Sequence, residues 1–166
     1  MGHSRTLAQA NALIFVPVKS AWLNLRRSRY FIGPYSDTPD ITLIGPPPYH
    51  VASEECSHDE LGHTIRMALE ASRDERVSWE DAVRLGEERT LYLARLAGVK
   101  ERRTFERRAR LVNFDCVGPA EILVTPSFRK RGYWEPAPEG QWLRVVQASD
   151  AELGSAAVQA VGRSTG

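Results

Sequence analysis

The chain has 166 residues, of which 42% are hydrophobic and 26% are charged, and its formal net charge is +1. Such a chain can bury a core of its own, which argues against a disordered protein. It lacks an apolar run of the roughly 18 residues that span a membrane, a secretory signal pattern and the cysteine framework of small secreted domains. We therefore predict one cytoplasmic domain over residues 1–166, in which residues 1–11 form a loose lead-in.

Three short strands are predicted in the first third of the chain. Residues 13–16 are continuously apolar, residues 21–26 alternate apolar and polar side chains, and residues 41–44 form another short apolar run. Gly33-Pro34 indicates a turn, because this dipeptide commonly interrupts regular structure. Three consecutive prolines make residues 45–49 an extended loop.

A helix-opening pattern occurs twice. Ser57 and Glu60 have the spacing of a capping box, which predicts a helix near residues 57–73. The hexapeptide that opens it, SHDELG, recurs near the other end of the sequence as SDAELG. This recurrence predicts a similar capped helix near residues 149–163.

Each copy of the pattern carries a glycine, Gly62 or Gly154, one position after its leucine. Glycine inside a helix costs roughly 1 kcal/mol relative to alanine. Its usual compensation is close approach of another backbone. We therefore expect both helices to pack against the sheet through these glycines.

Another helix is predicted between the two copies. Ser78 can cap it, Asp81 stands at the capping-box position, and Gly98 supplies a C-terminal stop. Its apolar stripe includes Trp79 and Val83, which predicts that both side chains are buried.

The chain from residue 100 onward predicts a short helical turn and then an antiparallel sheet. The turn covers residues 100–108, and strands are expected at 112–116, at 121–125, where a proline ends the strand, and at 142–146. Residues 129–140 are polar and contain prolines, which predicts a loop. The predicted fold class is α+β: a single domain in which an antiparallel sheet packs with helices.

The sequence contains no assembled catalytic motif. His50, Cys56, His58 and His63 lie close together in sequence, but His58 and His63 are five residues apart rather than the four that bring zinc ligands to one helical face. We predict no catalytic residue, no metal and no cofactor, and hence a binding protein rather than an enzyme. An enzyme of unrecognised type stays an alternative.

Charge is distributed unevenly along the chain. Residues 37–81 contain eleven acidic and three basic residues, a net charge of −8, whereas residues 84–110 contain nine basic and four acidic residues, a net charge of +5. This asymmetry favours oriented encounter with a charged partner, although helix faces that pair with one another would give the same pattern. The basic segment 100–110, with Phe105 to stack on a base, makes nucleic-acid binding a further alternative.

Four aromatic residues occur in stretches that resemble loops, beside prolines or charged residues: Tyr30, Tyr35, Tyr49 and Trp134. Exposed tyrosine and tryptophan are typical anchors of protein interfaces, so these positions favour a protein-binding surface.

Within the first capped helix, the segment from Glu60-Leu61-Gly62 to Ser72-Arg73 resembles one found in immunity proteins of bacterial contact-dependent growth inhibition systems. The resemblance covers roughly residues 12–164, with the strands, helices and second "LG" helix in the same order. The second copy departs from the pattern, since Gly162-Arg163-Ser164 replaces the Ser-Arg ending.

The resemblance implies a non-enzymatic cytoplasmic protein that binds the C-terminal toxin domain of a large cell-surface effector as a 1:1 heterodimer and occludes its active site. Neither nucleic acid nor membrane is then expected as a partner. Such toxins are commonly nucleases, and a nuclease presents a basic cleft to which an acidic surface would be steered. The predicted partner-binding residues are Tyr35, Asp37, Asp40, Tyr49, Glu54, Glu55, Asp59, Asp74 and Glu75. A toxin with an acidic face would select the arginines at 102–110 instead.

Overall fold

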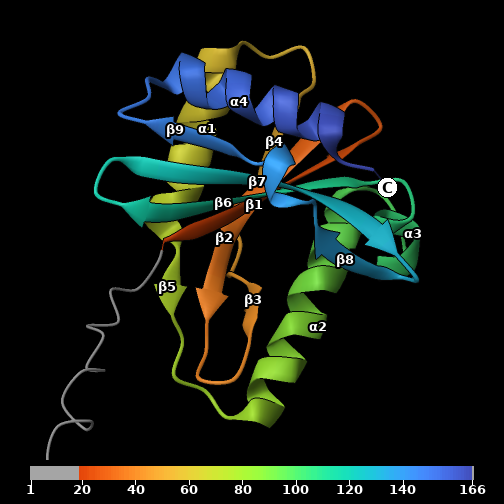
Figure 1. Ribbon diagram of the computed structural model, residues 1–166. Coiled ribbons are helices and arrows are strands. Elements are labelled where there is room, and N and C mark those ends of the chain that lie inside the picture. The colour runs from red at the N-terminus through yellow and green to blue at the C-terminus, as the bar shows by residue number, and fades with distance from the viewer. Residues whose placement is uncertain (1–18, 166) are drawn as a thin grey trace, which may run out of the picture.

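A computed structural model describes residues 19–165, which form a nine-stranded sheet and four α-helices (Figure 1). The predicted strand at 13–16 and the lead-in at 1–11 lie outside the described residues. The strands are β1 (Ser20–Arg26), β2 (Arg29–Asp37), β3 (Thr42–Ile44), β4 (His50–Ser53), β5 (Arg73–Asp74), β6 (Arg110–Gly118), β7 (Glu121–Lys130), β8 (Tyr133–Pro136) and β9 (Leu143–Val146). The helices are α1 (His58–Ala71), α2 (Trp79–Leu96), α3 (Arg102–Glu106), α4 (Asp150–Arg163) and a 3₁₀ turn, η1 (Glu139–Gln141).

The sheet has the order β3-β2-β1-β6-β7-β8, with β4 and β5 also paired to β2 and β9 to β7. Its pairings are antiparallel except for the two-residue parallel pairing of β5 with β2. The predicted α+β class is therefore confirmed.

Two strands continue through prolines where the sequence indicated interruptions. Pro34 lies in β2 between Ile32, the last residue paired with β4, and Tyr35, the first paired with β3. Pro126 lies in β7 in the same way, between the residues paired with β9 and those paired with β8. A proline has no N–H to donate, and a position where a strand changes neighbours tolerates that loss. The predicted turn at Gly33-Pro34 and the predicted end of the strand at residue 125 are therefore wrong.

The predicted loop at 129–140 is also partly wrong, because β7 and β8 form a hairpin there. Its two-residue turn, Arg131-Gly132, has φ values of 51° and 89°. Left-handed conformation at both turn positions matches the twist of paired strands. Arg27 and Ser28, with φ of 51° and 59°, join β1 to β2 in the same way.

Helices cover both faces of the sheet and form a core on each. α1 and α4 pack on the face that carries Ala21 and Leu23, while Trp22 points to the opposite face, where the C-terminal half of α2 and α3 pack. The alternation expected for residues 21–26 is thus confirmed, and it divides the core into two clusters.

The two capping boxes form as predicted, at Ser57 with Glu60 and at Ser149 with Glu152. The glycines that follow do allow a close backbone approach, but the neighbour is the other helix and not the sheet. A Cβ added at Gly62 would overlap the Asp150 carbonyl, and one added at Gly154 would overlap the His58 carbonyl. Each glycine therefore lies against the first turn of the opposite helix.

The N-terminal half of α2 projects beyond the sheet beside β3, and β5 and the end of β2 lie on the other side of β3 (Figure 1). We call this projection, residues 34–44 and 73–88, the arm. Its helix buries the side defined by Ala82, Arg89 and Leu93. Trp79 and Val83 lie on the flank of that side and are 51% and 38% exposed, so the prediction that they are buried is wrong.

Candidate functional site

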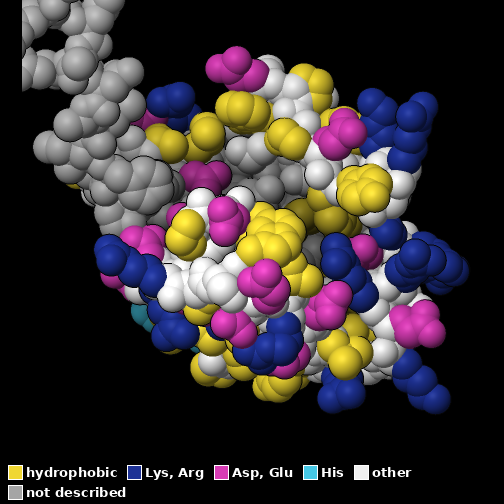
Figure 2. All heavy atoms as spheres, turned by 90° about the horizontal axis from the view of Figure 1, so that it is seen from below, with side chains coloured by type: hydrophobic (Ala, Val, Ile, Leu, Met, Phe, Trp, Pro, Cys, Tyr) yellow, Lys and Arg dark blue, Asp and Glu magenta, His cyan; other side chains and the backbone are white. Residues whose placement is uncertain are grey.

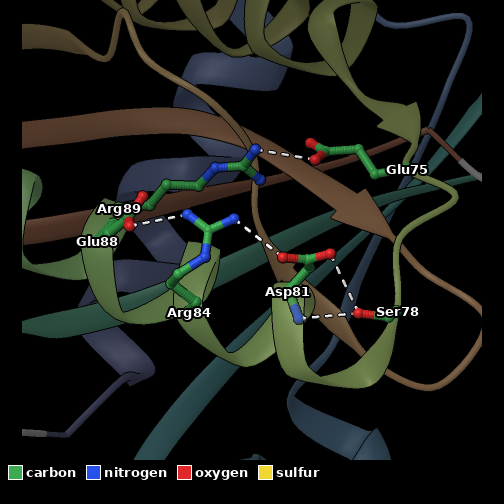
Figure 3. Close-up of polar contacts among 6 residues, drawn as sticks. All are labelled: Glu75, Ser78, Asp81, Arg84, Glu88 and Arg89. Atoms are coloured by element: carbon green, nitrogen blue, oxygen red, sulfur yellow. Dashed lines mark hydrogen bonds and ion pairs between the residues drawn. The ribbon is translucent and has the colours of Figure 1, made fainter.

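One carboxylate holds the arm together. Glu75 accepts a hydrogen bond from Arg89 Nη2 at 2.9 Å (Figure 3). It also accepts one from Ser36 Oγ at 2.8 Å, and Arg73 Nε lies 3.5 Å from Glu75 Oε1. Arg89 Nη1 also donates to the Ile44 carbonyl at 3.1 Å. The Glu75–Arg89 pair therefore ties β5, α2 and both strands of the β2–β3 hairpin into one unit.

This pair is largely shielded from water, with 10% of the Glu75 side chain and 8% of the Arg89 side chain exposed. Burial alone would raise the pKa of Glu75, but the hydrogen bonds from Arg89 and Ser36, together with the charges of Arg89 and Arg73, hold that pKa below its usual value. Glu75 is therefore an ionised structural group beneath the surface rather than a free acid on it.

The first turns of α2 carry a ladder of polar side chains. Ser78 Oγ accepts from the Asp81 amide at 3.2 Å, which confirms the predicted cap, and donates to the Asp81 carboxylate at 3.1 Å. Arg84 then bridges Asp81 and Glu88 at 3.1 and 3.0 Å (Figure 3). Its hydrogen bond to Asp81, with that from Ser78, lowers the pKa of Asp81. The ladder fixes the start of the helix and the backbone from which Trp79 projects.

The outer surface of the arm combines acidic and apolar side chains. A hollow of about 220 Å³ is lined by Asp37, Thr38, Pro39, Asp74, Glu75 and Arg76. Trp79 begins α2 three residues after this lining, and Val83 follows it one turn later. Seen from below, hydrophobic side chains lie among acidic ones (Figure 2). A rigid, acidic surface with an exposed tryptophan suits recognition of a protein.

The structure separates the predicted acidic patch into two groups. Asp37, Asp40, Asp74 and Glu75 come together on the arm, at the end of β2. The other three acids, Glu54, Glu55 and Asp59, lie near the start of β2, where the Glu54 amide donates to the Ser28 carbonyl at 2.9 Å. A strand of nine residues separates its ends by about 26 Å at roughly 3.3 Å per residue. The two groups therefore belong to different ends of the molecule.

The tyrosines of the predicted site point inward. Tyr49 is 7% exposed, donates to the Gly45 carbonyl at 2.8 Å and packs edge-on against Trp22 and Tyr92. Tyr35 donates to Asn113 Oδ1 at 2.7 Å, and burial raises the pKa of both phenols. Tyr30 is also buried. The expectation that these aromatic residues are exposed is wrong, because their loops and strands fold over them.

Sequence reasoning missed Trp79 and Val83 as surface residues. The signal that could have found them is the helical wheel of α2, on which Ala82, Arg89 and Leu93 define a narrow buried stripe. Trp79 and Val83 lie at its margin. The helical wheel shows this only if Arg89 is assigned to the buried side. The sequence of the helix gives no reason for that assignment, because Glu75, the partner of Arg89, lies outside the helix.

Among residues 19–165, no group of three histidine, cysteine, aspartate or glutamate side chains is placed to hold a metal ion. Both cysteines are free, and burial raises the pKa of their thiols. Of the helices in the described part of the chain, none has the length and apolar content to cross a membrane.

The fold and the surface are together typical of a protein-binding domain. The chain belongs to the CdiI family of CDI immunity proteins, whose family model matches residues 19–164. These are the immunity proteins of contact-dependent growth inhibition, the family that the helix pattern at residues 60–73 resembles.

Two solved structures share the fold. A protein of unknown function from Neisseria meningitidis is 20% identical, with a TM-score of 0.72, over 88% of this chain and 94% of that one. A chain of the CdiA-CT/CdiI toxin and immunity complex from Yersinia pseudotuberculosis is 18% identical, with a TM-score of 0.75, over 89% of this chain and 98% of that one. No curated protein matches the sequence.

Proposed function

We propose that this protein is a non-enzymatic inhibitor that acts in the cytoplasm, where it binds the cognate toxin domain of a contact-dependent growth inhibition effector as a 1:1 heterodimer. Membership of the immunity family supports the class of function. The Yersinia pseudotuberculosis structure shows the same fold in a toxin and immunity complex. Neither metal nor cofactor takes part, because neutralisation by occlusion requires only a complementary surface.

The arm is the proposed toxin-binding surface, and the exposed Trp79 is the observation that carries it. Tryptophan is among the residues that contribute most to protein interfaces, and a half-exposed one on a rigid helix is prepared to enter a pocket. Asp37 and Asp74 line the hollow that precedes it in the chain, and the exposed Asp40 lies on the same β2–β3 hairpin, which gives the arm negative charge. A nuclease toxin with a basic substrate cleft would be attracted to this surface and blocked by it.

The remaining members of the predicted patch have supporting parts in this proposal. Tyr35 and Tyr49 position β2 and the 45–49 loop from within, and Glu75 anchors the arm through Arg89. Glu54, Glu55 and Asp59 form a separate acidic group near the start of β2, and they contact only a toxin that reaches across the sheet.

The test is neutralisation and co-purification with the cognate toxin domain. The wild-type protein is expected to rescue cells that express the toxin and to co-purify with it in a 1:1 ratio. The double variant Asp40→Lys/Asp74→Lys should lose both properties, whereas Glu139→Lys, an exposed charge reversal outside the arm, should keep them.

Two results would overturn parts of this proposal separately. Failure of the wild-type protein to rescue or to co-purify would refute the function. Full rescue by the arm double variant, with loss of rescue in Glu54→Lys/Glu55→Lys, would keep the function and move the interface to the start of β2.

A further inference from the structure

The end of the molecule away from the arm is basic. Figure 2 shows lysine and arginine side chains gathered on the side where Figure 1 places α3 and β8. Three segments distant in sequence contribute them: the β1–β2 turn, α3 with its flanks, and the β7–β8 turn. Their exposed basic residues, here called the basic end, are Arg27, Arg29, Lys100, Arg102, Arg103, Arg107, Arg108, Arg110, Lys130 and Arg131.

Buried contacts fix these three segments against one another. Arg26 Nε donates to the Phe105 carbonyl at 3.1 Å, which joins the β1–β2 turn to α3. Arg129 Nη2 donates to Glu106 Oε2 at 3.2 Å, which joins β7 to α3. Phe31 packs edge-on against Phe105 with ring centres 5.7 Å apart. The positive charges are therefore held in a defined arrangement rather than on independent loops.

Few of these basic residues form ion pairs, although the acidic Glu54 borders the β1–β2 turn and Glu101 precedes α3. Of the ten residues of the basic end, the ion pairs within residues 19–165 engage only Arg102, with Glu106, and Lys130, with Glu135. Burial lowers the pKa of Arg26, and the nearby charges of Arg27 and Arg108 lower it further. Like charges brought together in this way oppose folding, which favours a role in binding a dense anion.

The composition of the surface indicates whether this anion is a nucleic acid or an acidic protein. Protein interfaces have an apolar centre from which charged residues are depleted. Within residues 26–29, 100–110 and 129–133, the exposed large hydrophobic side chain is Tyr133, 76% exposed beside the β7–β8 turn. Phe105, the sequence-based candidate for stacking on a base, is 2% exposed and belongs to the core. Unpaired arginines, with one exposed aromatic ring beside Lys130 at the β7–β8 turn, fit a phosphate backbone with an unpaired base better than they fit a protein.

We propose that the basic end binds single-stranded nucleic acid, with the arginines on the phosphates and Tyr133 stacked on a base. This surface lies apart from the arm and does not depend on toxin binding, so each proposal can fail alone.

The experiment is fluorescence anisotropy of the purified full chain with a labelled 15-nucleotide single-stranded RNA, the matching DNA strand and their duplex. Saturable binding of the single strands at 50 mM salt is expected, weaker for the duplex. Contacts with about four phosphates would lower affinity about 50-fold between 50 and 200 mM salt. Absence of saturable single-strand binding at 50 mM salt, or tighter binding of the duplex, would overturn the proposal.

Matched variants distinguish binding at the basic end from a non-specific effect of the protein's net charge. Arg103→Glu should weaken binding about tenfold, whereas Arg76→Glu, which makes the same charge change on the arm, should not. Tyr133→Ala should weaken it about tenfold, and Tyr133→Phe should restore it, because stacking needs the ring alone. Equal effects of Arg103→Glu and Arg76→Glu, or no effect of Tyr133→Ala, would contradict the proposal. Displacement by polyglutamate at equal charge concentration would do so too, and would point to an acidic protein partner.

Discussion

The α1–α4 pair and the arm both contain helices capped by serine, but the pair buries its helix contact whereas the arm exposes apolar side chains. In the pair, each helix offers a glycine so that the carbonyl of the other can approach, and the contact is backbone on backbone. In the arm, the half of α2 that leaves the sheet offers Trp79 and Val83 to solvent. The comparison separates residues that determine whether the chain folds from residues available to a partner.

Glycine provides the sharpest contrast between the two regions. Gly62 has no room for a methyl group, whereas a Cβ at Gly86, in the arm half of α2, meets nothing within 4 Å. Glycine is therefore required for packing at Gly62, whereas at Gly86 it only lowers the helix propensity and can be replaced. The following predictions, in decreasing order of effect, test this division.

Gly62→Ala should cause the largest loss. The added methyl would overlap the Asp150 carbonyl, and overpacking against backbone, which cannot rotate away, exceeds the roughly 1 kcal/mol gained in helix propensity. We expect the free energy of unfolding to fall by about 3 kcal/mol in urea denaturation. The control is Gly162→Ala in α4, where the methyl meets nothing and stability should not fall. Equal stability of the two variants would show that the helices can move apart at little cost.

Glu75→Gln should lower stability by nearly as much, about 3 kcal/mol at pH 7, because Arg89 would keep a shielded charge without its partner. The folded-state pKa of Glu75 lies below its ordinary 4.5, so the ionised group stabilises the fold above about pH 4.5. That contribution is lost as the pH falls through the lowered pKa. The difference between wild type and variant, followed by urea denaturation, should therefore shrink between pH 5 and pH 3. A constant difference would assign the loss to shape rather than charge.

Trp79→Ala should leave stability within about 0.5 kcal/mol, since the side chain is half exposed. Its Kd for the toxin domain, measured by calorimetry, should rise about 30-fold, which corresponds to about 2 kcal/mol. Val158→Ala, which truncates an exposed apolar residue on α4, is the control and should change Kd less than about twofold. If the variant does not fold, Trp79 is required for folding rather than for binding. If Kd does not change, Trp79 is not part of the interface.

Gly86→Ala should give the smallest effect and the opposite sign. With free space around the new methyl, only helix propensity changes, and the protein should gain up to about 1 kcal/mol in urea denaturation. A loss of stability would indicate that the arm half of α2 packs more tightly than its surroundings suggest.

Local chemistry explains which parts of this fold the sequence predicts. Ser57 and Glu60 satisfy the helix end by themselves, so the capping boxes are correctly predicted from four consecutive residues. The alternation of residues 21–26 likewise gives the two faces of β1. These signals need no knowledge of the rest of the chain.

Except for the local β7–β8 hairpin, the errors depend on partners that are distant in sequence. Pro34 reads as a turn until β3 and β4 are known to meet β2 on either side of it. Gly62 signals a close approach, but only the position of Asp150 identifies the neighbour. Tyr49 reads as exposed beside prolines, although Trp22 and Tyr92 enclose it. Asp37 and Asp74 of the predicted acidic patch are brought together by β5, a strand of two residues that no local pattern indicates.

The reciprocal glycine contact also orders events during synthesis of the chain on the ribosome. It joins His58 to Gly154, which lies more than half the length of the chain further on. The helix pair can therefore form only after Gly154 has emerged. The arm, by contrast, needs nothing beyond Arg89 for its central ion pair. Domains form from the N-terminal side as synthesis proceeds, and non-local contacts form late. The surface proposed to meet the toxin is thus encoded early, while the contact that locks the scaffold comes last.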